Sequence, residues 1–103
     1  MKIFETGTIM HLQGHLTGSG VTTRRVEALD IFLQRMESAG KKNIRIDCGR
    51  ILRADVNGLQ LLYVWIQCAG FEGLEVELVN LSCRLQVIMR KLGLWHCFAG
   101  NMV

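Results

Sequence analysis

The sequence predicts a mixed α/β domain in which helices cover mainly one face of a β-sheet of four to five strands. Short strand-like segments alternate with helix-like segments along the chain, a pattern typical of sheets with parallel strands. The strand-like segments alternate apolar and polar residues, which indicates that each strand buries only one face. A doubly wound sheet, covered on both faces, would need strands that are apolar on both sides, so this class is excluded.

Alternation and turn residues give the positions of the strands. We expect strands at residues 2–5, 8–13, 43–48 and 74–79, with a short last strand at 95–98. The first two form a hairpin, with a turn at Thr6 and Gly7. The third and fourth each place three apolar side chains at alternate positions with charged residues between them, as half-buried strands do.

Apolar periodicity gives the positions of the helices, which we expect at residues 21–38, 58–69 and 82–92. From Val26 to Met36, apolar residues recur at intervals of three and four, the spacing of one helical face. The second helix is almost wholly apolar and the third is amphipathic. Gly40 and Gly93 end the first and the third. The order is therefore β-β-α-β-α-β-α, and its crossovers favour parallel pairing of the inner strands.

Length and composition indicate one folded domain, which we expect to span residues 1–103. Half of the residues are hydrophobic and 20% are charged, which favours a packed core over disorder. The net charge of +3 is small and its bases are scattered among acids, so no nucleic-acid partner is expected. Glu5 and His11 interrupt any signal-peptide core, and no apolar stretch could span a membrane, so we expect a cytoplasmic protein without direct membrane insertion.

The cysteines Cys48, Cys68, Cys83 and Cys97 are far apart and form no CxxC pair. This spacing matches neither a zinc site nor a redox motif. Free cysteine is among the most buried residue types. We therefore expect reduced cysteines in or near the core.

Three short motifs resemble functional sites without meeting their requirements. The glycine-rich segment 14–20 lacks the Gly-Lys-Ser/Thr ending of a phosphate-binding loop, which favours a turn before a helix. His11 and His15 have no third ligand nearby, which argues against a metal site. His96 and Cys97 are neighbours on the expected last strand and would point to opposite faces. We expect no catalytic residue, no metal and no cofactor, and therefore no enzyme.

A longer pattern follows the third strand. The segment 46–62 reads IDCGRILRADVNGLQLL, and it is followed by GLEVELVNLS and by a helix that ends in Leu-Gly-Leu at 92–94. This pattern resembles the STAS family of sulfate-transporter and anti-sigma-factor-antagonist domains, over about the whole chain. Its most specific part is a strand, a loop, Asp-x-x-Gly-Leu and an apolar helix. The resemblance implies a STAS-like fold and a stand-alone bacterial module of signal transduction and transcription regulation.

The resemblance also implies a docking site in this loop, formed by Asp55, Val56, Asn57, Gly58 and Leu59. In anti-sigma-factor antagonists the residue before the glycine is a serine, which is phosphorylated by a partner kinase that doubles as the anti-sigma factor. Asn57 takes that position here, and neither Asn57 nor Val56 has a hydroxyl group, so the position is not phosphorylatable. Asp55 or Asn57 can instead cap the following helix by accepting hydrogen bonds from its first amides.

A helical wheel at about 100° per residue separates two faces of the second helix. We expect one face to point to the sheet, with Gly58, Leu62, Trp65, Ile66 and Ala69. The opposite face carries Gln60, Tyr63, Val64 and Gln67, next to Val56. An exposed apolar patch of this kind is typical of an interface, so we expect these residues to dock a protein partner. The alternative is that another segment, such as residues 95–103, covers them.

Two functions follow from the resemblance. The first is a non-enzymatic regulatory protein–protein interaction module, similar to anti-sigma-factor antagonists, that docks on a kinase, an anti-sigma factor or another signalling protein. The alternative is a cytosolic accessory subunit of an ABC-type phospholipid transport system, because small STAS domains also resemble the subunit that binds its ATPase. The sequence leaves the identity of the partner and the existence of a homodimer open.

Overall fold

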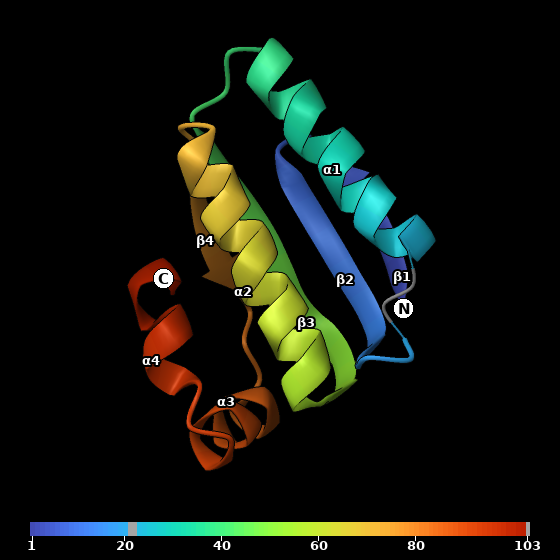
Figure 1. Cartoon of the computed structure of the whole chain (residues 1–103), viewed down its shortest axis with the longest axis vertical. Coiled ribbons are helices and arrows are strands. Elements are labelled where there is room, and N and C mark those ends of the chain that lie inside the picture. Colours follow the sequence, from blue (N-terminus) through green and yellow to red (C-terminus); the bar gives the residue numbers. More distant parts are fainter. Residues whose placement is uncertain (21–22, 103) are drawn as a thin grey trace.

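The computed structural model describes the backbone of residues 1–20 and 23–102 and the side chains of residues 1–20 and 26–102. Figure 1 shows the chain with its elements labelled. They are β1 (Lys2–Thr6), β2 (Ile9–Leu16), α1 (Thr23–Ser38), β3 (Asn43–Ala54), α2 (Val56–Phe71), β4 (Glu75–Val79), α3 (Cys83–Lys91), α4 (Trp95–Phe98) and η1 (Ala99–Asn101). The order of the first seven elements confirms the prediction; the predicted start of the first helix, at residues 21 and 22, lies outside the described residues.

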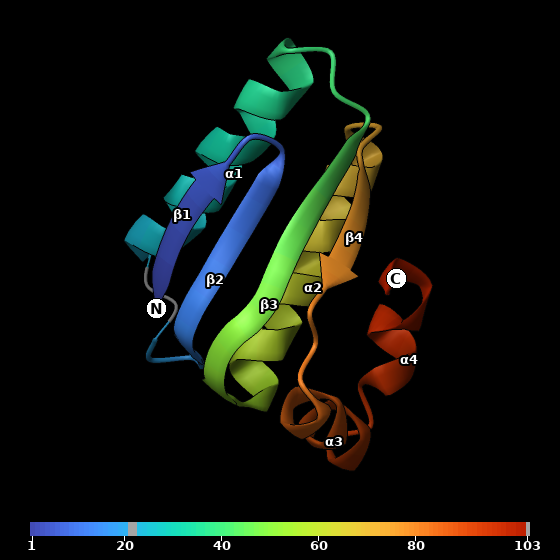
Figure 2. The ribbon, with the colours of Figure 1, turned by 180° about the vertical axis from the view of Figure 1, so that it is seen from behind.

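The four strands form one mixed sheet in the order β1-β2-β3-β4. The hairpin strands β1 and β2 are antiparallel, whereas β2 pairs with β3 and β3 with β4 in parallel, as the crossovers predict. Helices α1 and α2 lie side by side on one face of the sheet, and the opposite face is open (Figures 1 and 2). Helices α3 and α4 lie beside the β4 end of the sheet (Figures 1 and 2). The predicted one-sided α/β architecture is therefore confirmed.

Strand β3 is longer than predicted. The alternation that defines it ends at Cys48, but the strand continues to Ala54 and buries Ile51. Its pairing with β2 shifts register twice, between His11 and Gln13 and between Gly14 and His15. Such irregularities change which side chains face the core. The residues predicted to form a loop before Asp-x-x-Gly-Leu therefore belong to the strand.

The expected strand at residues 95–98 is instead the short helix α4. Leu94 and Phe98 are four residues apart, which places them on the same side of a helical turn, and Phe98 is fully buried. This correction also changes the arrangement of His96 and Cys97, which do not point to opposite faces: His96 Nε2 lies 3.8 Å from Cys97 Sγ.

The core lies between the sheet and the helices. The residues predicted to face the sheet from α2 are all buried, which confirms the predicted inner face of this helix. Cys48 is also buried, as expected, whereas Cys68 in α2 and Cys83 in α3 are exposed, so the prediction is wrong for these two. Among the described residues, no helix is long and apolar enough to cross a membrane.

Candidate functional site: the start of α2 and its outer face

Asp55 connects the first turn of α2 to the loop that follows β2. It is the N-cap residue of the helix, as the sequence allowed, and its Oδ1 accepts a hydrogen bond of 2.8 Å from the Gly58 amide. The same Oδ1 accepts a second bond, of 3.2 Å, from the Gly18 amide. The Asp55 amide donates to the Leu16 carbonyl oxygen at 3.1 Å. The glycine-rich segment therefore serves as a turn that is fixed to the helix start.

Glycine is required at position 58 because the two segments are in direct contact. A Cβ atom at Gly58 would lie 2.0 Å from the Leu16 carbonyl oxygen and 2.7 Å from the Thr17 amide nitrogen. At Gly18, a Cβ atom would lie 3.1 Å from the Asn57 Cβ. The glycine of Asp-x-x-Gly-Leu thus lets the helix start approach the end of β2 closely.

The five residues of the predicted docking loop lie at different depths. Leu59 and Gly58 are buried and hold the loop in place. Asp55 is partly buried, and its carboxylate accepts hydrogen bonds from the Gly18 and Gly58 amides. Asn57 is exposed, and Val56 is 40% exposed. Val56 and Asn57 are therefore the two side chains of this loop that a partner could contact.

The predicted outer face of α2 is largely open. Gln60 and Gln67 are exposed, and Val64 is 56% exposed. Tyr63 is only partly exposed, because its ring packs edge-to-face against Phe98 with 6.0 Å between ring centroids. The alternative that the C-terminal segment covers this face therefore holds for Tyr63 but not for Val64.

Two exposed apolar residues of α2 were absent from the predicted site. Leu61 is 40% exposed and Phe71 is 88% exposed. A helical wheel places Leu61 between Val64 and Trp65, so periodicity could have indicated it. Phe71 lies beyond the predicted end of the helix at residue 69, which is why it was missed. None of the 16 residues of α2 has a charged side chain, although the outer face of a surface helix normally carries charged or polar residues.

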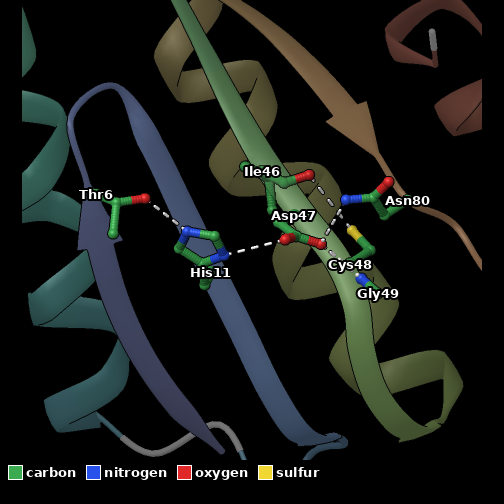
Figure 3. Close-up of polar contacts among 7 residues, drawn as sticks. All are labelled: Thr6, His11, Ile46, Asp47, Cys48, Gly49 and Asn80. Atoms are coloured by element: carbon green, nitrogen blue, oxygen red, sulfur yellow. Dashed lines mark hydrogen bonds and ion pairs between the residues drawn. The ribbon is translucent and has the colours of Figure 1, made fainter.

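A second polar cluster lies on the open face of the sheet (Figure 3). Thr6 Oγ1 lies 2.8 Å from His11 Nε2, and His11 Nδ1 lies 3.0 Å from Asp47 Oδ2. Asp47 Oδ1 accepts further bonds from the Gly49 amide at 2.9 Å and from Asn80 Nδ2 at 3.3 Å. Burial raises the pKa of Asp47, but the hydrogen bonds from Gly49, Asn80 and His11 outweigh it and lower the pKa. In the sequence, His11 was weighed only together with His15, as a metal site, and this cluster was not predicted.

Hydroxyl, imidazole and carboxylate follow one another in this cluster as they do in Ser-His-Asp triads. An ionised carboxylate only accepts hydrogen bonds, so His11 Nδ1 donates to Asp47, and in the neutral ring Nε2 accepts from the Thr6 hydroxyl. The side chains lie across the open face of the sheet, whereas substrate sites are concave (Figure 3). The cluster connects β1, β2 and β3 to the residue after β4, which stabilises the pairing of the strands.

The described residues contain no group of three or more His, Cys, Asp or Glu side chains placed to hold a metal ion.

The fold and the site together define an α/β domain of the STAS type. Helices cover one face of the sheet, and the helix after the longest strand begins with a capping residue and needs a glycine in its first turn. A family model described as "Mlab, STAS domain" matches residues 5–102. The chain belongs to this family.

Solved structures show the same fold. The structure of the anti-sigma factor antagonist SpoIIAA in its unphosphorylated form is 18% identical, with a TM-score of 0.58, over 99% of this chain and 86% of that one. A structure described as "Crystal Structure Analysis of Mglu" is 23% identical with a TM-score of 0.58, over 80% of this chain but only 20% of that one. The comparison with curated proteins found no match. At these identities the likeness concerns the fold alone.

Proposed function

We propose that the chain is a non-enzymatic regulatory module that docks on a protein partner. The docking surface consists of the 55–59 loop and the adjacent outer face of α2, with Gln60, Tyr63, Val64 and Gln67. The observation that carries this proposal is the uncharged α2, with the exposed Val56, Leu61 and Val64 on its surface. Exposed apolar patches on small domains usually mark interaction sites.

The structure of the loop supports this role. The Asp55 carboxylate already binds two amides, and Gly58 packs against the backbone of β2, so the exposed Val56 and Asn57 are held on a fixed frame. A preorganised surface loses little conformational entropy on binding, which favours affinity. Asn57 offers no hydroxyl group for phosphorylation, so docking at this loop does not depend on phosphorylation of residue 57.

Two classes of partner are consistent with this surface. The first is a kinase, an anti-sigma factor or another signalling protein, which the resemblance to anti-sigma-factor antagonists and the likeness in fold to SpoIIAA support. The second is the ATPase of an ABC-type phospholipid transporter. The resemblance of small STAS domains to the accessory subunit of such a transporter supports this second class, and membership of a STAS family is consistent with both.

Affinity capture with a matched pair of variants tests the proposal. Val64→Lys places a charge on the outer face of α2, and Val87→Lys makes the same change at a residue of α3 with a similar exposure, 45% against 56%. The captured proteins are identified by mass spectrometry, and the affinity for the purified partner is then measured for each variant. We expect Val64→Lys to weaken binding at least about tenfold and Val87→Lys to leave it unchanged.

The identity of the captured protein separates the two classes of partner, since one is a kinase-like or sigma-regulating protein and the other an ABC ATPase. Equal binding by the two lysine variants would show that the partner does not use α2, and the proposed docking surface would be wrong.

A further inference from the structure

A small apolar cavity opens between α1 and α2, above β2, and it has a volume of about 230 Å³. Leu12 from β2, Leu29 from α1 and Trp65 from α2 form its buried walls. Leu61, Val64 and Cys68 lie at its rim and are exposed. The two helices run side by side in the same direction over the sheet (Figure 1), so the cavity is part of the groove between them.

The size of the cavity indicates what could fill it. Sites for small molecules and cofactors usually have volumes of about 300–1,000 Å³, so this cavity is smaller than such a site. It is suited to one or two apolar side chains, and interface anchors typically fill pockets of this kind. A groove between two helices that has exposed apolar residues along its rim is the shape in which an amphipathic helix binds.

Negative charge lies along the same groove. Asp30 lines the cavity. Glu37 lies in the last turn of α1 and Glu72 is the C-cap residue of α2, and the charge of Glu72 raises the pKa of Glu37. The C-terminal ends of helices are themselves negative. Among the described residues these three acids form no ion pair with a base, and Lys41 and Lys42 in the following loop do not pair with them. A partner that brings positive charge would relieve this repulsion.

We propose that the α1–α2 groove binds an amphipathic helix of the protein partner, which inserts an apolar anchor into the cavity and places Lys or Arg against Glu37 and Glu72. Asp30 and Glu37 are seven residues apart on α1, which is about two helical turns. The partner helix therefore carries its basic residues about seven positions from the anchor, on the same face. This inference rests on the proposed docking function, and it adds the chemistry and the position of the bound segment.

Two synthetic peptides of 16 residues, as long as α2, test the chemistry. Both peptides have the same amino-acid composition. In the first, the Lys residues lie about seven positions from a Phe anchor and on the same face of the helix as the Phe. In the second, the Lys residues are moved to the opposite face. Binding is measured by fluorescence anisotropy at low and high salt. We expect the first peptide to bind more tightly by about tenfold, and its binding to weaken with salt. Equal binding by the two peptides, or no binding by the first, would overturn the proposal.

The cysteines give an internal control for the position. Cys68 lies at the rim of the cavity, whereas Cys83 is exposed on α3. Alkylation followed by mass spectrometry should show protection of Cys68 but not of Cys83, with the first peptide and with the partner identified above. Protection of Cys68 by high concentrations of the chain alone would identify a second copy as the occupant and overturn the proposal.

Charge variants complete the test. The double variant Glu37→Gln and Glu72→Gln should bind the first peptide roughly threefold more weakly for each charge removed, while Glu75→Gln, at an exposed acid of β4, should bind it as the unchanged chain does. A partner that is sensitive to Val64→Lys but leaves Cys68 reactive and ignores the double variant would refute this inference and leave the docking function standing. A partner insensitive to all of these changes would refute both.

Discussion

Replacement of Gly58 by alanine should destabilise the domain, although alanine normally favours a helix. The new Cβ would lie 2.0 Å from the Leu16 carbonyl oxygen, whereas real Cβ atoms essentially never come closer than 3.0 Å, so α2 and β2 must separate by about 1 Å. Such overpacking costs about 1–3 kcal/mol. The separation also weakens the Asp55 amide bond to Leu16 and the Gly18 amide bond to Asp55, together about 2 kcal/mol. The better helix propensity of alanine offsets at most about 1 kcal/mol.

The net loss in the free energy of unfolding is therefore about 2–4 kcal/mol, a large part of the 5–15 kcal/mol that is typical of a domain. Urea unfolding followed by circular dichroism measures it. Gly70→Ala is the matched control, because it lies in the same helix and its Cβ would meet no atom within 4 Å. We expect this control to be unchanged or more stable by up to about 1 kcal/mol. Equal stability of the two variants would refute the close approach of α2 to β2.

Three further predictions concern single side chains. Trp65→Ala should cost about 3–5 kcal/mol in urea unfolding, and Tyr63→Ala less, because Trp65 is buried and Tyr63 is partly exposed. Asn57→Asp should keep the melting temperature, since an acid is favourable at a helix start, but weaken binding in a partner titration. The pKa of Asp47 is lowered from its ordinary value of 3.8, so Asp47 stabilises the fold above pH 3.8, and this stability is lost as the pH falls through the folded-state pKa; Asp47→Asn should therefore flatten the acid limb of a pH-dependent melt.

Periodicity predicted the features that depend on local sequence. Trp65 and Leu62 recur on one side of α2, and this side is buried as the helical wheel indicated. The strands were predicted for the same reason as far as the alternation continues. Beyond Cys48 the alternation fails, because β3 and β2 shift register, and a shift of this kind depends on two strands rather than on one.

Contacts between distant residues could not be predicted in this way. His11 and Asp47 are 36 residues apart, and their contact follows from the parallel pairing of β2 with β3. The partial cover of Tyr63 by Phe98 depends on α4, whose four residues are too few for a clear helical period. The sequence therefore indicated the outer face of α2 but not which part of it the C-terminal segment would cover.

The strands lie in the sheet in the order in which they occur in the chain. Each strand pairs with the strand made just before it, so none has to enter between two strands that are already paired. During synthesis the sheet can therefore grow at one edge, strand by strand. The last edge, β4, is then partly covered by residues that come later in the chain: Asn101 Nδ2 donates to the Val76 carbonyl oxygen at 3.0 Å, and Met102 forms a bridge with Leu78. Because an open edge can pair with another chain, the turn at residues 99–102 helps to protect the β4 edge from aggregation.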